Sequence, residues 1–217
     1  MDHADVTWDE HNVSDVTGAA LVLRTYIEHS DVRNYLKWVE SRTSLVSACD
    51  VGAGYGRMSP VLKEFFQLVV AFEREDSLVR KGSYLQPTTQ FRQIKELSSL
   101  PATTGEFDFA LSFTVLQHLP DLLAEATAAE IRRVVRPGGF VLFCEETDDT
   151  HSLGDIADPH VDFAGRPVER YKEWMAPFDL VRCSPRNIER GYERVNVGTY
   201  LLFRSPVKRA EVHVTPL

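Results

Sequence analysis

Short apolar runs of strand length alternate with helical patterns from about residue 45 to the end of the chain. We expect strands at 45–51, 68–72, 90–94, 107–113, 140–145, 178–183 and 199–204, and helices at about 57–66, 77–85, 122–135 and 167–176. This alternation is typical of a mostly parallel sheet with flanking helices. The last two strands follow each other without a convincing helix between them, which predicts an antiparallel strand at one edge. The pattern therefore predicts an α/β fold with a seven-stranded sheet.

Two further helical patterns, at 16–29 and 31–42, precede the first strand, and Ser30 between them is a plausible cap for the second. We interpret residues 1–42 as an N-terminal helical cap or lid, and residues 43–217 as the rest of one globular domain. Trp8 in this segment is either an aromatic residue of the lid or a packed side chain.

Composition and charge narrow the class of protein. The 217 residues are 43% hydrophobic and 26% charged, which is typical of a folded globular chain. No apolar run has the ~18–20 residues that a membrane helix needs, and the acidic N-terminus does not resemble a secretory signal, so we expect a cytoplasmic protein. The net charge of -8 argues against nucleic acid as a partner. Cys49, Cys144 and Cys183 have neither disulfide nor zinc spacing, and we expect three buried thiols.

The most informative segment is 49–57, CDVGAGYGR, in which an apolar strand runs into a glycine-rich turn. Its glycines, at 52, 54 and 56, are evenly spaced, unlike those of a dinucleotide-binding fingerprint. Asp50 stands before the first glycine, where a carboxylate would repel a pyrophosphate but would suit an ammonium group. Glu73 follows the next strand, at the place where an acid accepts ribose hydroxyls, or it is simply a solvated charge. Together the two acids indicate a nucleoside that carries an amino-acid group.

At this point the chain resembles the class I, Rossmann-like S-adenosylmethionine-dependent methyltransferases across residues 45–146. The segment FDFALSFTVLQHLPD, 107–121, is similar to the fourth-strand motif of that family, and VVRPGGFVLFCEE, 134–146, to its turn and fifth strand. The resemblance implies S-adenosyl-L-methionine as cofactor and S-adenosyl-L-homocysteine as product. The cofactor-binding residues that it implies are Asp50, Gly52, Gly54, Tyr55, Gly56, Arg57, Glu73, Arg74, Glu96, Leu97, Phe113 and Thr114.

Within that set the resemblance implies different roles. Arg57 would pair with the methionine carboxylate, or lie at the surface at the start of a helix. Glu96 and Leu97 match the adenine position, where family members usually carry an Asp or a short polar residue. Phe113 and Thr114 match the strand end that faces the methionine moiety.

The resemblance implies in-line transfer of a methyl group to a nitrogen or oxygen nucleophile of a small metabolite or a peptide end. His118 is the candidate general base, although a histidine in this turn commonly packs and shapes the loop. Trp8, Glu146 and His151 are candidates for the acceptor pocket, against the alternative that residues 146–162 form a solvated loop. No metal site is expected, because the spacing of His151 and His160 matches no known ligand pattern.

Two other functions stay open at this stage. A protein that binds S-adenosylmethionine for regulation would keep Asp50 and Glu73 without transferring a methyl group. An NAD-dependent oxidoreductase would need a different glycine turn.

The GAGYGR and VLQHL segments are similar to protein N-terminal α-amine methyltransferases, which favours an amine acceptor. The sequence does not identify the acceptor or the oligomeric state.

Overall fold

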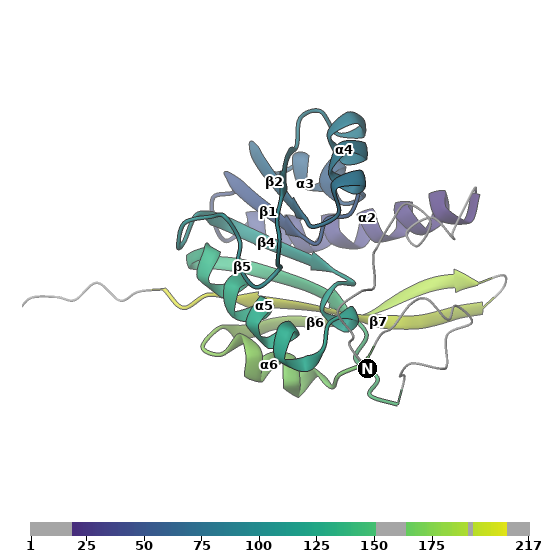
Figure 1. Ribbon diagram of the computed structural model, residues 1–217. Helices are drawn as coiled ribbons and strands as arrows, with labels where there is room; N and C mark the ends of the chain where they lie inside the picture. Colours follow the sequence, from purple (N-terminus) through teal and green to yellow (C-terminus); the bar gives the residue numbers. More distant parts are fainter. Residues whose placement is uncertain (1–18, 151–163, 191–192, 208–217) are drawn as a thin grey trace, which may run out of the picture.

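The computed structural model describes residues 19–150, 164–190 and 193–207. Helices and strands alternate through most of this range, as the sequence pattern predicts (Figure 1). The helices are α2 (Ala19–Glu40), α3 (Ser59–Lys63), α4 (Asp76–Leu85), α5 (Asp121–Val134) and α6 (Val168–Met175), with a short 3-10 helix η1 (Leu116–His118). The strands are β1 (Ser47–Val51), β2 (Leu68–Glu73), β3 (Gln90–Gln93), β4 (Phe107–Phe113), β5 (Val135–Glu145), β6 (Asp179–Arg190) and β7 (Glu193–Arg204).

The seven strands form one mixed sheet in the order β3-β2-β1-β4-β5-β7-β6. Strands β1 to β5 are parallel, while β7 pairs antiparallel with both β5 and β6. The predicted seven-stranded, mostly parallel sheet with an antiparallel edge is confirmed. Strands β2 and β3 are added on one side of β1, whereas β4 and β5 are added on its other side, so the strand order switches between β1 and β4. In open α/β sheets, ligands bind at the carboxyl ends of the strands at such a point.

Side chains on both faces of the sheet are buried, because alternate residues of each strand point to opposite sides. Val32, Leu36, Val61 and Leu62 of α2 and α3 pack on one face, and Ala128, Ile131, Tyr171 and Met175 of α5 and α6 pack on the other. Continuous apolar strands of this kind are expected in a sheet covered by helices. Among the described residues no helix is long and apolar enough to span a membrane.

Several boundaries differ from the sequence prediction. The two predicted N-terminal helices are one continuous helix, α2, so Ser30 lies in a helix interior and caps nothing. One apolar stripe runs past Ser30 through Val32, Leu36 and Val39, and its burial outweighs the weak preference of serine for a helix end. The predicted role of residues 1–42 as a lid stays a prediction, because residues 1–18 lie outside the described range.

The antiparallel edge is larger than predicted, since β6 and β7 each have 12 residues rather than the six expected. Helix α3, in contrast, is shorter than predicted, and it begins at Ser59 rather than at Arg57. Cys49 and Cys144 are buried, but Cys183 is exposed, so the prediction of three buried thiols is wrong at that position. The reason is that Cys183 lies on β6, the outermost strand of the sheet.

Helix α2 is fastened to the domain by a fully buried carboxylate, that of Glu28. Glu28 accepts hydrogen bonds from Arg57 after β1, from Arg186 on β6, whose Nε lies 3.1 Å away, and from Arg24 one helical turn earlier, also at 3.1 Å. Burial alone would raise the pKa of Glu28, but the three guanidinium groups lower it to about 2. His29 adds a second attachment, because its Nε2 lies 2.7 Å from the carbonyl oxygen of Arg57.

Glu28→Ala should therefore destabilise the fold by about 3–5 kcal/mol, because it leaves the buried Arg186 without its carboxylate partner. Urea denaturation at pH 7 measures this change. The wild-type contribution of Glu28 should persist above the ordinary carboxyl pKa of about 4.3 and disappear as the pH falls toward 2. Glu64→Ala is the matched control. It removes the exposed ion-pair partner of Arg33, which lies on α2 as Glu28 does, and should cost at most about 1 kcal/mol. Equal losses in the two variants would contradict the prediction.

Candidate functional site

The glycine turn after β1 is shaped by backbone conformations that side chains rarely adopt. Gly52, Gly54 and Gly56 have φ of 71°, 57° and 80°. A Cβ on Gly52 would lie 2.7 Å from the side chain of Val115, so the turn packs closely against the segment that follows β4. At Gly54, in contrast, a Cβ would meet nothing within 4 Å. The turn is thus closely packed at both ends and open at its middle glycine, where a ligand can approach the backbone.

Asp50 lies under this turn as the fourth residue of β1, with 2% of its surface exposed. Its Oδ2 is buried and accepts no hydrogen bond from the residues that the structure describes. Burial raises the pKa of Asp50 to about 7, although the attraction of Arg57 acts to lower it. A buried carboxylate oxygen without a partner is costly, and a ligand ammonium group would satisfy it.

Glu73 ends the neighbouring strand β2 and is also buried, with 7% of its surface exposed. Its carboxylate accepts backbone hydrogen bonds from Gly54 at 2.7 Å, Arg74 at 2.6 Å and Glu75 at 2.9 Å. Burial raises its pKa, while these three donors oppose the rise. The three backbone donors orient the carboxylate. Because a carboxylate has about four lone-pair positions, it can still accept a hydrogen bond from a ligand hydroxyl. The interpretation of Glu73 as a solvated charge is wrong.

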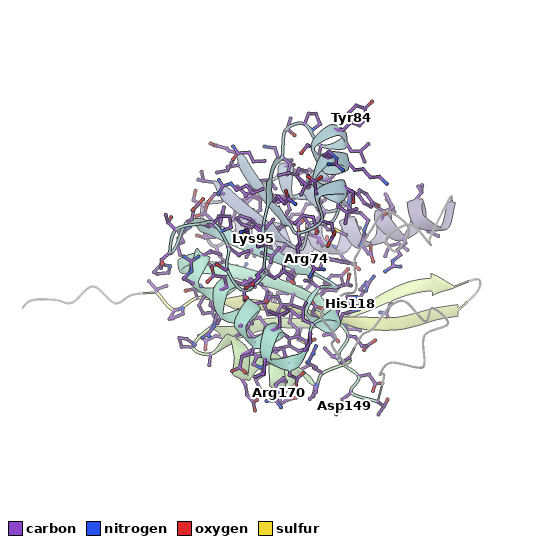
Figure 2. The ribbon with its side chains drawn as sticks, viewed as in Figure 1. Arg74, Tyr84, Lys95, His118, Asp149 and Arg170 are labelled. Atoms are coloured by element: carbon purple, nitrogen blue, oxygen red, sulfur yellow. The ribbon has the colours of Figure 1, made fainter. Side chains whose placement is uncertain are left out.

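Other predicted cofactor residues lie around this centre. Tyr55 is half-buried, with Lys81 Nζ 5.3 Å from the centre of its ring, and the half-buried Arg74 has its Nε 3.2 Å from Glu75. Leu97 is half-buried against the core, whereas the side chain of Glu96 is exposed. Figure 2 labels Arg74 and His118, which both lie toward the side of the molecule from which the β6–β7 hairpin projects.

The end of β4 forms the opposite side of the site. Phe113 is buried, and Thr114 has a φ of 56°, which is uncommon for a residue other than glycine and marks local strain. The following turn carries His118, which is half-buried, with its Nε2 3.3 Å from the Nε2 of Gln117. The structure thus places Asp50, Glu73, Phe113 and His118 at the carboxyl ends of β1, β2 and β4.

Sequence reasoning missed the residue that holds this turn, Glu145 at the end of β5. Its fully buried carboxylate accepts hydrogen bonds from the backbone of Val115 at 3.1 Å, Leu116 at 3.2 Å and Gln117 at 3.1 Å. Burial raises its pKa to about 7, and these hydrogen bonds act against the rise. Its position after the apolar run 140–144 could have suggested a buried acid at a strand end.

The candidates for the acceptor pocket are less well defined. Glu146 is half-buried, and its Oε1 accepts hydrogen bonds from the backbone of Thr147 at 2.8 Å and Asp148 at 2.9 Å, so it stabilises the start of its own loop. Trp8 and His151 lie outside the described residues. Within residues 19–150, 164–190 and 193–207, no group of three or more metal-ligating side chains comes together.

Sequence reasoning also missed the cluster formed by Glu28 with Arg24, Arg57 and Arg186. The guanidinium carbons of Arg57 and Arg186 each lie 5.1 Å from the centre of the Phe113 ring, so the cluster borders the end of β4. The helical stripe to which Glu28 belongs was visible in the sequence, but a charged residue on it reads as a solvated position. The pairing of Arg57 with Glu28 shows that Arg57 is more than a surface residue at the start of a helix.

Comparison with known proteins points in one direction. Residues 49–143 match the model of a family described as "Methyltransferase domain". A ubiquinone biosynthesis O-methyltransferase from Xanthomonas oryzae pv. oryzae is 27% identical over 193 residues, covering 82% of this chain and 78% of the relative. A relative of the same name from Thiobacillus denitrificans is 22% identical over 158 residues, covering 69% of this chain and 67% of that protein.

Solved structures share the fold at lower identity. A protein from Pyrococcus horikoshii OT3 superposes with a TM-score of 0.68 at 17% identity, covering 89% of this chain and 94% of its own. A SAM-dependent methyltransferase from Leishmania major gives a TM-score of 0.67 at 16% identity, covering 86% of this chain and 74% of its own. The family match, the relatives and the shared fold agree with the glycine turn and its two buried acids. These findings support membership of the class I S-adenosylmethionine-dependent methyltransferase superfamily and the activity of a methyltransferase enzyme.

Proposed function

We propose that this enzyme transfers the methyl group of S-adenosylmethionine to a nucleophilic oxygen or nitrogen of a small-molecule acceptor, and that a hydroxyl is the favoured acceptor. The observation that carries the cofactor assignment is the unpartnered, buried Oδ2 of Asp50 below a glycine turn that is open at Gly54. The preference for oxygen is supported by the relatives, which are named as O-methyltransferases. An amine acceptor, favoured by the GAGYGR and VLQHL segments, is the second candidate.

In this proposal each buried acid has one role. Asp50 receives the ammonium group of the methionine moiety, and Glu73, held by three backbone donors, accepts the ribose hydroxyls. Arg57 pairs with the methionine carboxylate through the guanidinium nitrogens that do not contact Glu28. Leu97 and Glu96 border the adenine. Phe113 and Thr114 face the methionine moiety at the end of β4, and Tyr55 and Arg74 flank the turn.

The chemistry requires little more than alignment. When bound, S-adenosylmethionine supplies a methyl group that its sulfonium already activates. The protein must hold the acceptor in line with that methyl group and exclude water. Glu145 fixes the turn 115–117 through three backbone hydrogen bonds, and in this proposal His118, which follows the turn, accepts the proton of an acceptor hydroxyl.

Asp50→Asn should weaken binding of S-adenosylhomocysteine by about ten- to a hundredfold, because a charge-assisted hydrogen bond is replaced by a neutral one. Isothermal titration calorimetry at pH 8 measures the change. The thermal midpoint of the free variant should not fall, because the substitution removes a buried charge without removing a hydrogen-bonded partner of Oδ2. Unchanged affinity would overturn the assignment of the turn.

The same titration should depend on pH, with a sign fixed by Asp50. Its ionised form binds the ammonium group, and with a pKa of about 7 the ionised fraction increases as the pH rises. Wild-type affinity for S-adenosylhomocysteine should therefore rise about tenfold from pH 6 to pH 8. Comparison with Asp50→Asn separates this effect from the titration of Glu145, which the variant keeps, and the asparagine variant should give a flatter profile than wild type. Equal slopes for the two proteins would exclude Asp50 as the source.

His118→Ala should lower turnover of a hydroxyl acceptor about a hundredfold or more, because a positioned base typically contributes that much. Affinity for S-adenosylhomocysteine should be retained, since His118 lies outside the glycine turn. Turnover is measured by the release of S-adenosylhomocysteine. Acceptors are found by screening phenols and amines. His118→Gln is the matched variant, because it keeps a hydrogen-bonding side chain without a titrating group. Wild-type turnover in both variants would limit His118 to shaping the loop.

A further inference from the structure

The proposed reaction uses only one member, Arg57, of a larger group of charges in the structure. Three guanidinium groups, from Arg24, Arg57 and Arg186, surround the single carboxylate of Glu28. They come from three parts of the chain, since α2, the segment after β1 and strand β6 are far apart in sequence. Figure 1 shows the N-terminal part of α2 and the β6–β7 hairpin projecting on the same side of the sheet.

The cluster carries more positive than negative charge. Glu28 remains ionised, so these four side chains together have a surplus of two positive charges. Burial lowers the pKa of Arg24, and repulsion by Arg186 and Arg57 acts in the same direction, against the attraction of Glu28. Among other described acids, Asp50 acts on Arg57 and Asp31 acts on the neighbouring Tyr200. Under the proposed function Asp50 is paired with the methionine ammonium, and Arg57 with the methionine carboxylate.

The side chains of the cluster differ in accessibility. Arg186 and Glu28 are buried, with 3% and 0% of their side chains exposed, whereas Arg24 is 32% and Arg57 is 21% exposed. Buried Glu28 and Arg186 therefore form the base of the cluster, and the guanidinium groups of Arg24 and Arg57 form its accessible part. An arrangement in which buried partners hold two accessible guanidinium groups in place is suited to binding an anion.

A second, independent observation comes from Tyr200 on β7. Its side chain is 1% exposed, yet its hydroxyl has no hydrogen-bond partner within the described part of the chain, although it interacts electrostatically with Arg186 and Glu28. The Tyr200 ring contacts Phe113 with centroids 6.2 Å apart, so the hydroxyl belongs to the same region as the cluster. A buried hydroxyl normally has a partner, and an oxygen atom of a bound anion would provide one.

We propose that the methyl acceptor carries an anionic group, a carboxylate or a phosphate, and that Arg24 and the Tyr200 hydroxyl bind it above the base formed by Arg186 and Glu28, while Arg57 pairs with the methionine carboxylate. The inference rests on the proposed function, because it assigns the surplus charge to the acceptor after the methionine group has taken one guanidinium. Phe113, in contact with Arg57, Arg186 and Tyr200, links this site to the end of β4. The acceptor would thus be held by its anionic end while its nucleophile meets the methyl group.

The test measures binding of model anions to the protein saturated with S-adenosylhomocysteine, so that the methionine carboxylate already occupies its place. The probes are benzoate, phenyl phosphate and the neutral benzyl alcohol, titrated calorimetrically into wild type, Arg24→Gln and Tyr200→Phe. Arg33→Gln is the matched control, because Arg33 lies on the same helix but pairs with the exposed Glu64. Thermal melting verifies that each variant is folded.

We expect at least one anion to bind wild type about tenfold or more tightly than benzyl alcohol, and this advantage to be lost in Arg24→Gln and reduced in Tyr200→Phe. Arg33→Gln should bind as wild type does. The anion that binds more tightly assigns the group as carboxylate or phosphate. Anions that bind no better than benzyl alcohol, or equally well to Arg24→Gln, would overturn the proposal. Failure to bind S-adenosylhomocysteine would instead overturn the proposed function, and the anion titrations repeated without it would still test the cluster.

Discussion

The burial of three carboxylates at the ends of three parallel strands of one sheet is the constraint around which this site is built. The sheet is covered on both faces, so its carboxyl edge is the place where polar side chains of the strands can meet a ligand. Asp50, Glu73 and Glu145 end or nearly end β1, β2 and β5, and burial raises the pKa of all three. Such groups are costly to bury unless hydrogen-bond donors compensate them.

The three acids differ in the compensation that they receive. Glu73 and Glu145 each accept three backbone hydrogen bonds, and each thereby fixes the conformation of a turn. Asp50 has an oxygen without any donor. The fold thus uses two of its buried acids to shape the site and leaves the third incompletely satisfied. This difference makes Asp50 the buried acid at which a cationic ligand group would gain the most.

Much of the geometry around the glycine turn could be predicted from the sequence because the information there is local. The glycines at 52, 54 and 56 follow a buried strand directly, and their positive φ values are a property of the turn itself. The central parallel strands β1, β2 and β4 were also predictable, since each is a largely apolar run that ends near a turn. Ser30 was misread because the helix interior was decided by burial of the stripe containing Val32 and Leu36, which is a tertiary effect.

The missed residues depend on contacts between distant parts of the chain. Glu28 and Arg186 are 158 positions apart, and neither has a local pattern that distinguishes it from a solvated charge. Glu145 likewise accepts its hydrogen bonds from a turn about 30 residues earlier in the chain. Pairings of this kind arise from the sheet order, in which the hairpin β6–β7 returns beside β5. Single-sequence reasoning lacks that information until the topology is known.

Arg57 joins the two halves of the site and gives them a physical connection. It directly follows the last glycine of the turn, it contacts Glu28 through its side chain, and its carbonyl oxygen lies against His29. Any ligand group that attracts its guanidinium competes with Glu28 and so acts on the attachment of α2. Conversely, α2 and Arg186 set the position of Arg57 over Phe113 before a ligand arrives. The N-terminal helix and the antiparallel hairpin therefore determine the electrostatic field at the end of β4, where the acceptor must be aligned, while the glycine turn and Glu73 can serve the cofactor independently of what that acceptor is.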